Sequence, residues 1–301
     1  MKKFLLLIIL IASVFSLKAQ DPEFTQFYAN PLYLNPAFAG TNGGPRIVLN
    51  YRNQWPSLSA PFVTYSASYD QHFDGVGGGL GFQVWHDQAG DGELTTTFFS
   101  GIYSYHLNVN EKFTIKAGLQ VSGFQRSIDF SKLRFGDQID PRFGFVNPTQ
   151  EDLPTDGRDN TGIIPDFSAG VFGFTDKFYA GFAVHHITEP EQSFFGNPLS
   201  TLPRKYTVHT GMMLPLENLR NPTKFISPNI MFQRQGDFTQ VNMGGYYINN
   251  FFVAGLWFRQ TAPNSDAIMG LIGIKKDPFK LGYSYDFTVS DARPAATGSH
   301  E

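Results

Sequence analysis

The chain has 301 residues, a formal net charge of −3, a hydrophobic content of 42% and no cysteine. The lack of cysteine excludes disulfides, thiolate metal sites and cysteine nucleophiles. The small net charge and the scattered basic residues argue against nucleic acid as a partner. Aromatic residues make up 16% of the chain, an excess that suits the interfacial girdles of a membrane β-barrel.

Residues 1–19 are predicted to be a secretory signal peptide. Lys2 and Lys3 precede an apolar run from Phe4 to Phe15, and small residues follow near Ala19. This run is shorter than the about 20 apolar residues that a membrane-spanning helix needs, so a transmembrane anchor is the weaker interpretation. No later segment is long and continuously apolar, and membrane helices are therefore not expected.

Residues 20–45 match neither a clean strand nor a clean helix. Pro22, Pro31 and Pro36 interrupt regular structure, yet the segment is rich in aromatic side chains that would be costly in water. We therefore expect it to act as a plug that packs inside a barrel or across its periplasmic mouth. The residues expected to carry this packing are Phe27, Tyr28, Leu32, Tyr33, Asn35, Pro36 and Phe38.

From Arg46 onward the chain consists of short segments in which apolar and polar residues alternate. A barrel strand needs about ten residues, with one face toward lipid and the other toward the lumen. Residues 113–122 show this pattern, because Leu119 and Val121 lie on an apolar face and Lys116 and Gln120 on a polar one. The predicted strands are Arg46–Trp55, Phe62–Asp70, Gly77–Asp87, Thr95–Val109, Phe113–Ser127, Pro165–Phe174, Phe178–His186, Lys205–Leu214, Phe225–Arg234, Phe238–Tyr247, Phe251–Phe258, Ala267–Lys275 and Phe279–Thr288.

Residues 46–301 are therefore predicted to form an all-β fold, a transmembrane antiparallel β-barrel of about 14 strands. The connections after even-numbered strands include tight turns, whereas the two longest, Ile128–Ile164 and Ile187–Arg204, follow odd-numbered strands. This parity suits short periplasmic turns and long external loops. Single-chain bacterial barrels have even strand counts, so the last strand is expected to be missing from this chain. Pro228 predicts a bulge or a strand end.

Several blocks of the sequence resemble one known family in their order and spacing. They are Gln20–Tyr28, Asn35–Gly40, Asn50–Pro56, Tyr65–Asp70, Gly78–Phe82 and Gly298–Glu301. Together they resemble the PorP/SprF family, outer-membrane proteins of the type IX secretion system of Bacteroidota. The resemblance implies a location in that outer membrane and a role in protein secretion, gliding motility or adhesin attachment. The partners it implies are a secreted adhesin or its C-terminal sorting domain, other type IX secretion components and outer-membrane lipid.

Two functions from different classes follow from these observations. The first is a non-enzymatic barrel that supports export or surface attachment of secreted adhesins by binding their C-terminal sorting domain. The second is a transport channel for a small or apolar solute, which a continuous open lumen would favour. For the first function, the aromatic residues of the two longest loops are the candidate partner-binding residues: Phe130, Leu133, Phe135, Phe143, Phe145, Phe194 and Phe195.

Candidate residues for catalysis or metal binding are few. The chain has neither a G-x-S-x-G elbow nor an H-E-x-x-H motif, so no catalytic residue, cofactor or metal is expected. His185 and His186 should point to opposite sides of a strand, which prevents joint chelation, whereas His209 is expected to line the lumen. Solvation is a better interpretation than calcium binding for the acidic residues of the longest loop, which are Asp137, Asp140, Glu151, Asp152, Asp156 and Asp159.

The charged and tryptophan side chains of the strands are assigned structural roles. Trp55, Trp85 and Trp257 are interpreted as girdle anchors at the membrane interface. The charges on polar strand faces are expected to pair across the lumen, and these are Arg46, Arg52, Lys116, Lys205, Lys280, Asp70, Asp166 and Asp286.

Overall fold

A computed structural model describes residues 20–90, 94–133, 135–140, 142–146, 148–150, 158–194, 200–217, 219, 221–262, 265–290 and 298–301, without the side chains at 158 and 159. The predicted signal peptide, residues 1–19, lies outside the described residues. No helix within these ranges is long and apolar enough to cross a membrane.

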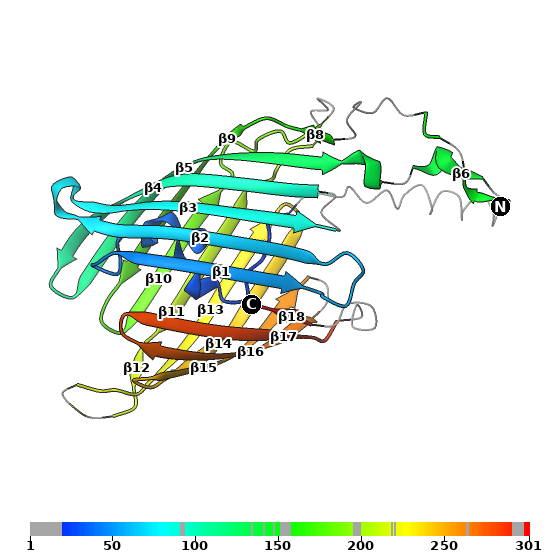
Figure 1. Cartoon of the computed structure of the whole chain (residues 1–301). Helices are drawn as coiled ribbons and strands as arrows, with labels where there is room; N and C mark the ends of the chain where they lie inside the picture. Colours follow the sequence, from blue (N-terminus) through cyan, green and yellow to red (C-terminus); the bar gives the residue numbers. More distant parts are fainter. Residues whose placement is uncertain are drawn as a thin grey trace, which may run out of the picture.

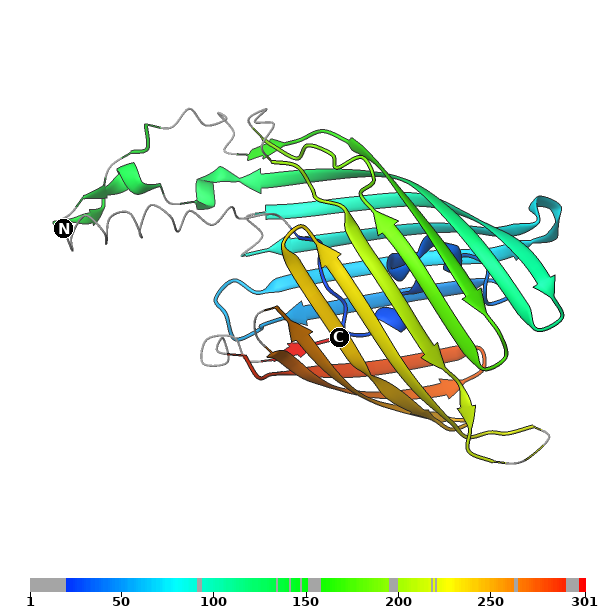
Figure 2. The same ribbon diagram turned by 180° about the vertical axis from the view of Figure 1, so that it is seen from behind.

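Long antiparallel strands form a single sheet that closes on itself (Figures 1 and 2). They are β1 (Arg46–Gln54), β2 (Phe62–Phe73), β3 (Gly78–Ala89), β4 (Leu94–Asn110), β5 (Phe113–Asp129), β9 (Ile164–Phe174), β10 (Phe178–His185), β11 (Lys205–Met212), β13 (Phe225–Gln235), β14 (Phe238–Ile248), β15 (Phe252–Thr261), β16 (Ser265–Lys276) and β17 (Phe279–Thr288). Each pairs with its neighbours in this order, so the barrel is an up-and-down meander.

The sheet closes through a short last strand. In β18 (Ser299–His300), the two residues pair with Asn53 and Gln54 of β1 on one side and with Tyr285 and Asp286 of β17 on the other. The predicted transmembrane barrel of about 14 strands is thus confirmed as a closed 14-strand antiparallel barrel. We expected the last strand to be missing from this chain. At that position, between β17 and β1, the structure has the two-residue strand β18.

Each predicted strand corresponds to one long strand of the barrel, and β17 has the predicted bounds. Pro228 does not break its own strand, because β13 pairs with β14 without a register shift through Pro228 and Gly245. The interruption falls on the other side, where Met213 separates β11 from β12 (Leu214–Pro215). The missing N–H of Pro228 thus disturbs the neighbouring strand instead.

The two faces of the barrel wall differ as the alternating sequence predicts. Ile47 and Leu49 point outward and are 73% and 76% exposed, as on a lipid-facing surface. On the inner face Arg52 and Lys116 are 1% and 0% exposed, although both carry a charge. Burying charged groups without partners would be strongly unfavourable, so the lumen must hold groups that pair with them.

The ends of the barrel differ in their connections. We call the end that bears residues 55–61, 90–93, 130–163 and 186–204 the long-loop end, and the opposite end the short-turn end. The connection 213–224, which includes β12, is the long exception at the short-turn end. At the long-loop end, the hairpin of β6 (Ile139–Asp140) and β7 (Gly144–Phe145) extends beyond the barrel rim (Figures 1 and 2). Beside it, β8 (Arg158–Asn160) pairs with the end of β5.

Candidate functional site

The N-terminal segment, residues 20–45, runs through the lumen between the two ends. Near the long-loop end the backbone N–H of Asp21 donates to Oε1 of Gln235, at 3.1 Å. Near the short-turn end the N–H of Gly40 donates to Oδ2 of Asp70, at 2.7 Å. Between these points lie three short helices, η1 (Phe27–Ala29), α2 (Pro31–Leu34) and η2 (Pro36–Phe38), seen inside the barrel in Figures 1 and 2.

Glycines on the inner wall form a seat for the second half of this segment. A Cβ on Gly118 of β5 would lie 2.3 Å from the Ala37 nitrogen, and one on Gly79 of β3 would lie 2.2 Å from the Ala39 oxygen. On β9, a Cβ at Gly170 would lie 2.1 Å from Oδ1 of Asn35. Only glycine permits such close approach of backbone to backbone, so this part of the wall is shaped to the segment.

Asn35 fixes the segment to three strands from this seat. Its Oδ1 accepts from the Ala37 N–H at 2.9 Å, which caps η2. Its Nδ2 donates to the carbonyls of Val171 and Phe182, at 3.0 and 3.3 Å, and lies 3.3 Å from Nε2 of His209. The side chain is fully buried and uses both its donor and acceptor atoms, so it specifies the position of the turn.

Aromatic side chains of the segment pack against the wall. Phe27 meets Trp257 edge to face at a centroid distance of 4.9 Å, and Phe38 lies 4.4 Å from Phe172. Tyr28 faces Tyr179 at 5.9 Å, and Leu32 is fully buried. Of the other residues expected in the plug, Tyr33 packs near Trp85 and Pro36 is buried over the glycine seat.

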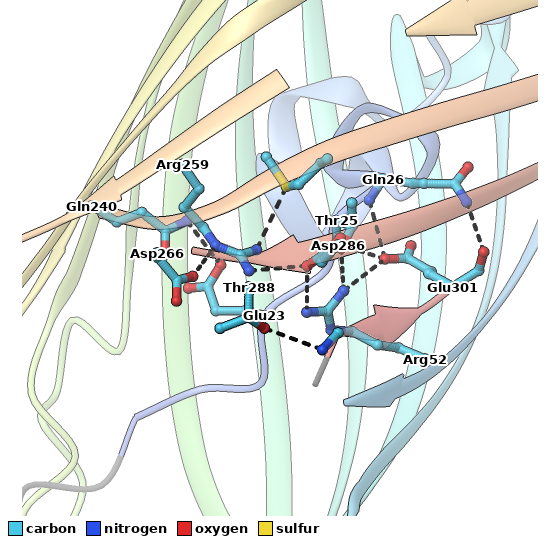
Figure 3. A network of polar contacts seen from close by, with 12 residues as sticks. Glu23, Thr25, Gln26, Arg52, Gln240, Arg259, Asp266, Asp286, Thr288 and Glu301 are labelled. Carbon is cyan, nitrogen blue, oxygen red and sulfur yellow. Dashed lines mark hydrogen bonds and ion pairs between the residues drawn. The ribbon is translucent and has the colours of Figure 1, made fainter. Parts of the chain in front are cut away.

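A buried ionic network holds the first half of the segment (Figure 3). Arg52 of β1 and Arg259 of β15 reach Oδ2 of Asp286 at 3.0 and 2.9 Å. Thr25 donates from Oγ1 to Oδ1 of the same carboxylate at 2.7 Å and accepts a hydrogen bond from Arg52. The backbone N–H groups of Thr25 and Gln26 donate to Oε2 of Glu301, at 2.5 and 3.1 Å. The segment thus supplies hydrogen-bond partners to charged groups of β1 and β17 and to Glu301.

A second charged cluster lies at the start of the segment. His186 contacts Asp21 through Nε2 at 2.9 Å and Asp166 through Nδ1 at 2.8 Å. Nζ of Lys205 lies 3.6 Å from the Asp21 carboxylate. Burial alone would lower the pKa of His186, but Asp21 and Asp166 outweigh it and raise that pKa to about 9. Burial would raise the pKa of Asp21, but His186 and Lys205 hold it well below its usual range.

The expectation that His185 and His186 point to opposite sides is wrong. The strand β10 ends at His185, and His186 adopts a positive φ of 55°, so the alternation stops there. Both imidazoles are buried, at 8% and 4% exposure. The expected pairing of lumen charges holds at Arg46, which reaches Asp70 at 2.8 Å, and at the Arg52 network. His209 lines the lumen as expected, stacked on Phe38.

The interpretation of Trp85 and Trp257 as girdle anchors is also wrong. Both side chains face the lumen and are 5% and 3% exposed. On β3, Trp85 lies on the same face as Gln83 and Asp87, whereas Leu80 and Phe82 face outward. The alternation of polar and apolar residues in β3 therefore indicates that Trp85 faces the lumen. The general preference of tryptophan for membrane interfaces led to the wrong interpretation. Trp55 follows β1 at the long-loop end.

An outer cavity of about 390 Å³ opens at the long-loop end above the segment. It is lined by Gln20–Glu23 of the segment, by the inner faces of β2–β5, and by the loop residues Trp55, Gln192 and Leu202. Its aromatic floor is a cross-strand row in which Trp85 stacks on Phe98 at 4.9 Å and Phe98 on Phe124 at 6.4 Å. A neighbouring cavity toward the short-turn end measures about 20 Å³, enough for roughly one water molecule.

The candidate partner-binding residues of the long loops differ in their exposure. Phe130 is buried and faces Phe194 at a centroid distance of 6.4 Å, while Arg126 lies over the Phe194 ring. Phe143 and Phe145, on the β6–β7 hairpin, are exposed. Leu133 and Phe135 are half-buried, and Phe195 lies outside the described residues.

The acidic loop residues give no cation site among the residues that the structure describes, where no group of three or more potential ligands is arranged to hold a metal. Asp137 accepts from Thr149 and from the N–H of Gln150, and Asp140 accepts from two backbone N–H groups. Glu151, Asp152, Asp156 and the side chain of Asp159 lie outside the described part of the chain.

Comparison with known proteins links this barrel to one family. A family model described as "Type IX secretion system membrane protein PorP/SprF" matches residues 16–301, and no curated protein matches. Among solved structures, a "KdgM porin" is 10% identical over 84% of this chain and 96% of its own, with a TM-score of 0.35. A Pseudomonas aeruginosa FadL homologue is 12% identical, covering 85% of this chain and 84% of its own, with a TM-score of 0.41. These low scores add nothing to the barrel assignment, which rests on the strand pairing.

Proposed function

The chain belongs to the PorP/SprF family of type IX secretion system membrane proteins, and from this premise we propose that it binds the C-terminal sorting domain of secreted adhesins. In this proposal it is a non-enzymatic barrel of a Bacteroidota outer membrane, formed after removal of residues 1–19. It supports export or surface attachment of the adhesin, for gliding or adhesion, alongside other type IX secretion components and in contact with outer-membrane lipid.

The observation that carries the proposal is the contrast between the filled lumen and the open cavity above it. Residues 20–45 act as a plug, with fully buried contacts through Leu32, Asn35 and Ala37 on a glycine seat. A solute channel needs a continuous path, and this segment occupies the lumen where such a path would run. The cavity and the exposed Phe143 and Phe145 at the long-loop end instead offer surface to a protein arriving from outside.

The loop residues have different parts in this proposal. Phe143 and Phe145 on the β6–β7 hairpin contact the partner directly, together with Leu133, Phe135 and Phe195. Phe130 and Phe194 pack against each other and hold the two loops together at the rim. Loops longer than about 12–15 residues are usually functional or disordered. The lengths of loops 128–164 and 187–204 therefore support a role in binding.

Copurification tests the proposal. The native barrel, tagged and extracted in mild detergent, should copurify with a secreted protein that carries a C-terminal sorting domain. Shortening loops 128–164 and 187–204 should reduce adhesin on the cell surface while the barrel still inserts. Normal surface levels after both loops are shortened would contradict the role of the loops.

Conductance of the purified barrel tests the alternative, the transport function, because a plug in the lumen should block flow. In planar bilayers the complete chain should show no steady conductance, and a variant without residues 20–45 should conduct. Solute flux through the complete chain at the level of a porin would favour the channel instead.

A further inference from the structure

The inner wall of the barrel is apolar on β13–β16 toward the short-turn end, although barrel interiors are mostly polar. Phe225, Ile248 and Val253 lie side by side on β13, β14 and β15, in direct register. Leu271 of β16 pairs with Gly255, so it lies diagonally beside Val253 and deeper in the lumen. We call Phe225, Ile248, Val253 and Leu271 the inner apolar patch, and all four residues are half-buried.

The plug packs elsewhere on the wall. Its helices α2 and η2 lie against β3, β4, β5 and β9, across the lumen from the patch. Phe27 contacts β15 at Trp257, on the face that Val253 shares but four residues deeper. A Cβ added at Gly273, the partner of Val253 on β16, would have atoms of β15 and β17 as its three nearest neighbours, none of them from the plug. In the described part of the chain, the patch is therefore bordered by the wall and not by the plug.

Two lysines lie between the patch and the short-turn mouth. Lys275 of β16 and Lys280 of β17 pair directly across the strands on the inner face, one step nearer the mouth than Gly273. Like charges placed directly opposite each other destabilise a strand pair. Among the residues that the structure describes, no carboxylate lies within ion-pair distance of either lysine, and this includes Asp277 in the turn between them. The expected pairing of Lys280 across the lumen is thus wrong.

The nearest other charges of the inner face are already paired. Arg46 of β1 reaches the carboxylate of Asp70 at 2.8 Å, and Lys116 of β5 donates from Nζ to the carbonyl of Ala39 at 2.8 Å. The charge without a partner at this side of the mouth is therefore positive, and it borders apolar side chains. An anion between the two lysines would remove their mutual repulsion and gain charge-assisted hydrogen bonds.

From this arrangement we propose that the short-turn end of the lumen binds a free single-chain amphiphile with an anionic head group, of the fatty-acid class. The head group lies between Lys275 and Lys280, and the chain covers the inner apolar patch and removes it from water. Four residues separate Lys275 from Leu271 on β16, which at about 3.3 Å per residue gives a length of about 13 Å for the chain. Binding here needs no path past the plug and does not depend on a sorting domain.

Two other occupants fit the patch less well. The four side chains of the patch carry no polar atom, and the backbone groups of their strands pair within the sheet. A peptide backbone laid on the patch would therefore lose hydrogen-bond partners, which an acyl chain does not need. A membrane phospholipid contacts the outer face of the wall, and it would have to leave the bilayer to reach the inner one.

Photolabelling of the complete barrel in phosphatidylcholine vesicles tests the site. The probe is dodecanoic acid with a diazirine at the chain end, and mass spectrometry maps the labelled residues. We expect labels on the inner apolar patch, and competition by dodecanoate but not by uncharged dodecanol. The double variant Lys275→Gln, Lys280→Gln should lose at least about tenfold in labelling. Its matched control is Lys276→Gln, because Lys276 neighbours Lys275 but lies on the outer face, and it should label as the original barrel does.

The possible results decide between the occupants. Labels confined to outward residues such as Ile272 and Ile274, equal labelling of the double variant, or equal competition by dodecanol would overturn the proposal. So would labelling of the patch by a photoreactive phosphatidylglycerol in the bilayer, or stronger competition by an apolar acidic peptide than by dodecanoate. The heat-modifiable band in gel electrophoresis checks folding. If the double variant fails to fold, Val253→Gln, which makes the patch polar and keeps both lysines, should lose the label instead.

Discussion

Residues 20–26 and residues 30–40 are neighbouring stretches of one segment in one lumen, yet different forces hold them. The first stretch is bound by charged side chains that converge from distant strands, as Asp21 and Thr25 show. The second is bound chiefly by fit, because Asn35 and Ala37 rest on glycines that leave no room for a side chain. Charged side chains reach only its end, where Asp70 accepts from the Gly40 N–H and Lys116 donates to the Ala39 carbonyl. Ionic contacts respond to pH, salt and incoming charges, whereas close packing responds to volume.

This difference follows the axis of the barrel. The packed stretch lies toward the short-turn end, where the Gly40 N–H donates to Asp70. The start of the ionic stretch, Gln20–Glu23, lines the outer cavity at the long-loop end. Substitutions in the two stretches should therefore differ in how much they lower the free energy of unfolding and in where hydrogen exchange rises first. Their effects should also differ in their dependence on pH.

The largest loss is expected from Asp286→Ala. This change leaves Arg52 and Arg259 buried without their shared acceptor, which typically costs about 3–5 kcal/mol. Urea unfolding of the barrel in lipid vesicles measures the free energy of unfolding. Hydrogen exchange should rise at residues 20–26 before it rises at residues 30–40. Equal deprotection of both stretches would show that they are held as one unit.

A smaller but still clear loss is expected from Gly118→Val. The new side chain would collide with the backbone of Pro36 and Ala37, and overpacking of this kind costs about 1–3 kcal/mol. The matched control is Gly101→Val in β4, where a Cβ meets nothing within 4 Å. Unfolding in urea should separate the two variants, and hydrogen exchange should now rise first at residues 30–40. A control that is as unstable as Gly118→Val would refute the glycine seat.

The third test couples Asn35 with the glycine beneath it. Asn35→Ala removes hydrogen bonds to Val171 and Phe182 and should cost about 1–3 kcal/mol. Gly170→Ala places a Cβ against Oδ1 of Asn35, but this clash disappears when Asn35 is already alanine. A double-mutant cycle should therefore show a favourable interaction term of about 0.5–3 kcal/mol. Simple additivity would mean that the two residues do not share one site.

A last test uses pH, which should act on the ionic stretch through His186. The pKa of His186 is raised to about 9, so its stabilisation is complete below the ordinary histidine value near 6.5. It should fade as pH rises through about 9, where the imidazole loses its charge between Asp21 and Asp166. Unfolding measured from pH 6 to 10 should show this loss, and the His186→Gln variant should have a flatter profile. An identical slope in both proteins would assign the pH dependence to other groups.

The strands could be predicted from the sequence because alternation is local. A strand that separates lipid from the lumen must alternate apolar and polar residues, and every long strand of the barrel carries this signal in its own residues. The N-terminal segment could likewise be recognised as a buried plug, because prolines prevent a regular strand while Phe27 and Phe38 need burial. The family could also be predicted from the sequence, because the resemblance lies in short blocks such as Asn35–Gly40.

The tertiary structure alone decided which residues meet inside the lumen. Closure of the barrel brings Arg52 of β1 to the carboxylate of Asp286, and the path of the plug brings Thr25 to it. The roles of Gly118 and Gly170 appear only when the plug rests on them, because a glycine carries no side chain to indicate its contact. The aromatic row of Trp85, Phe98 and Phe124 likewise depends on strand register. Local periodicity determines which face a residue takes, but contacts across a lumen depend on closure, register and the path of the plug.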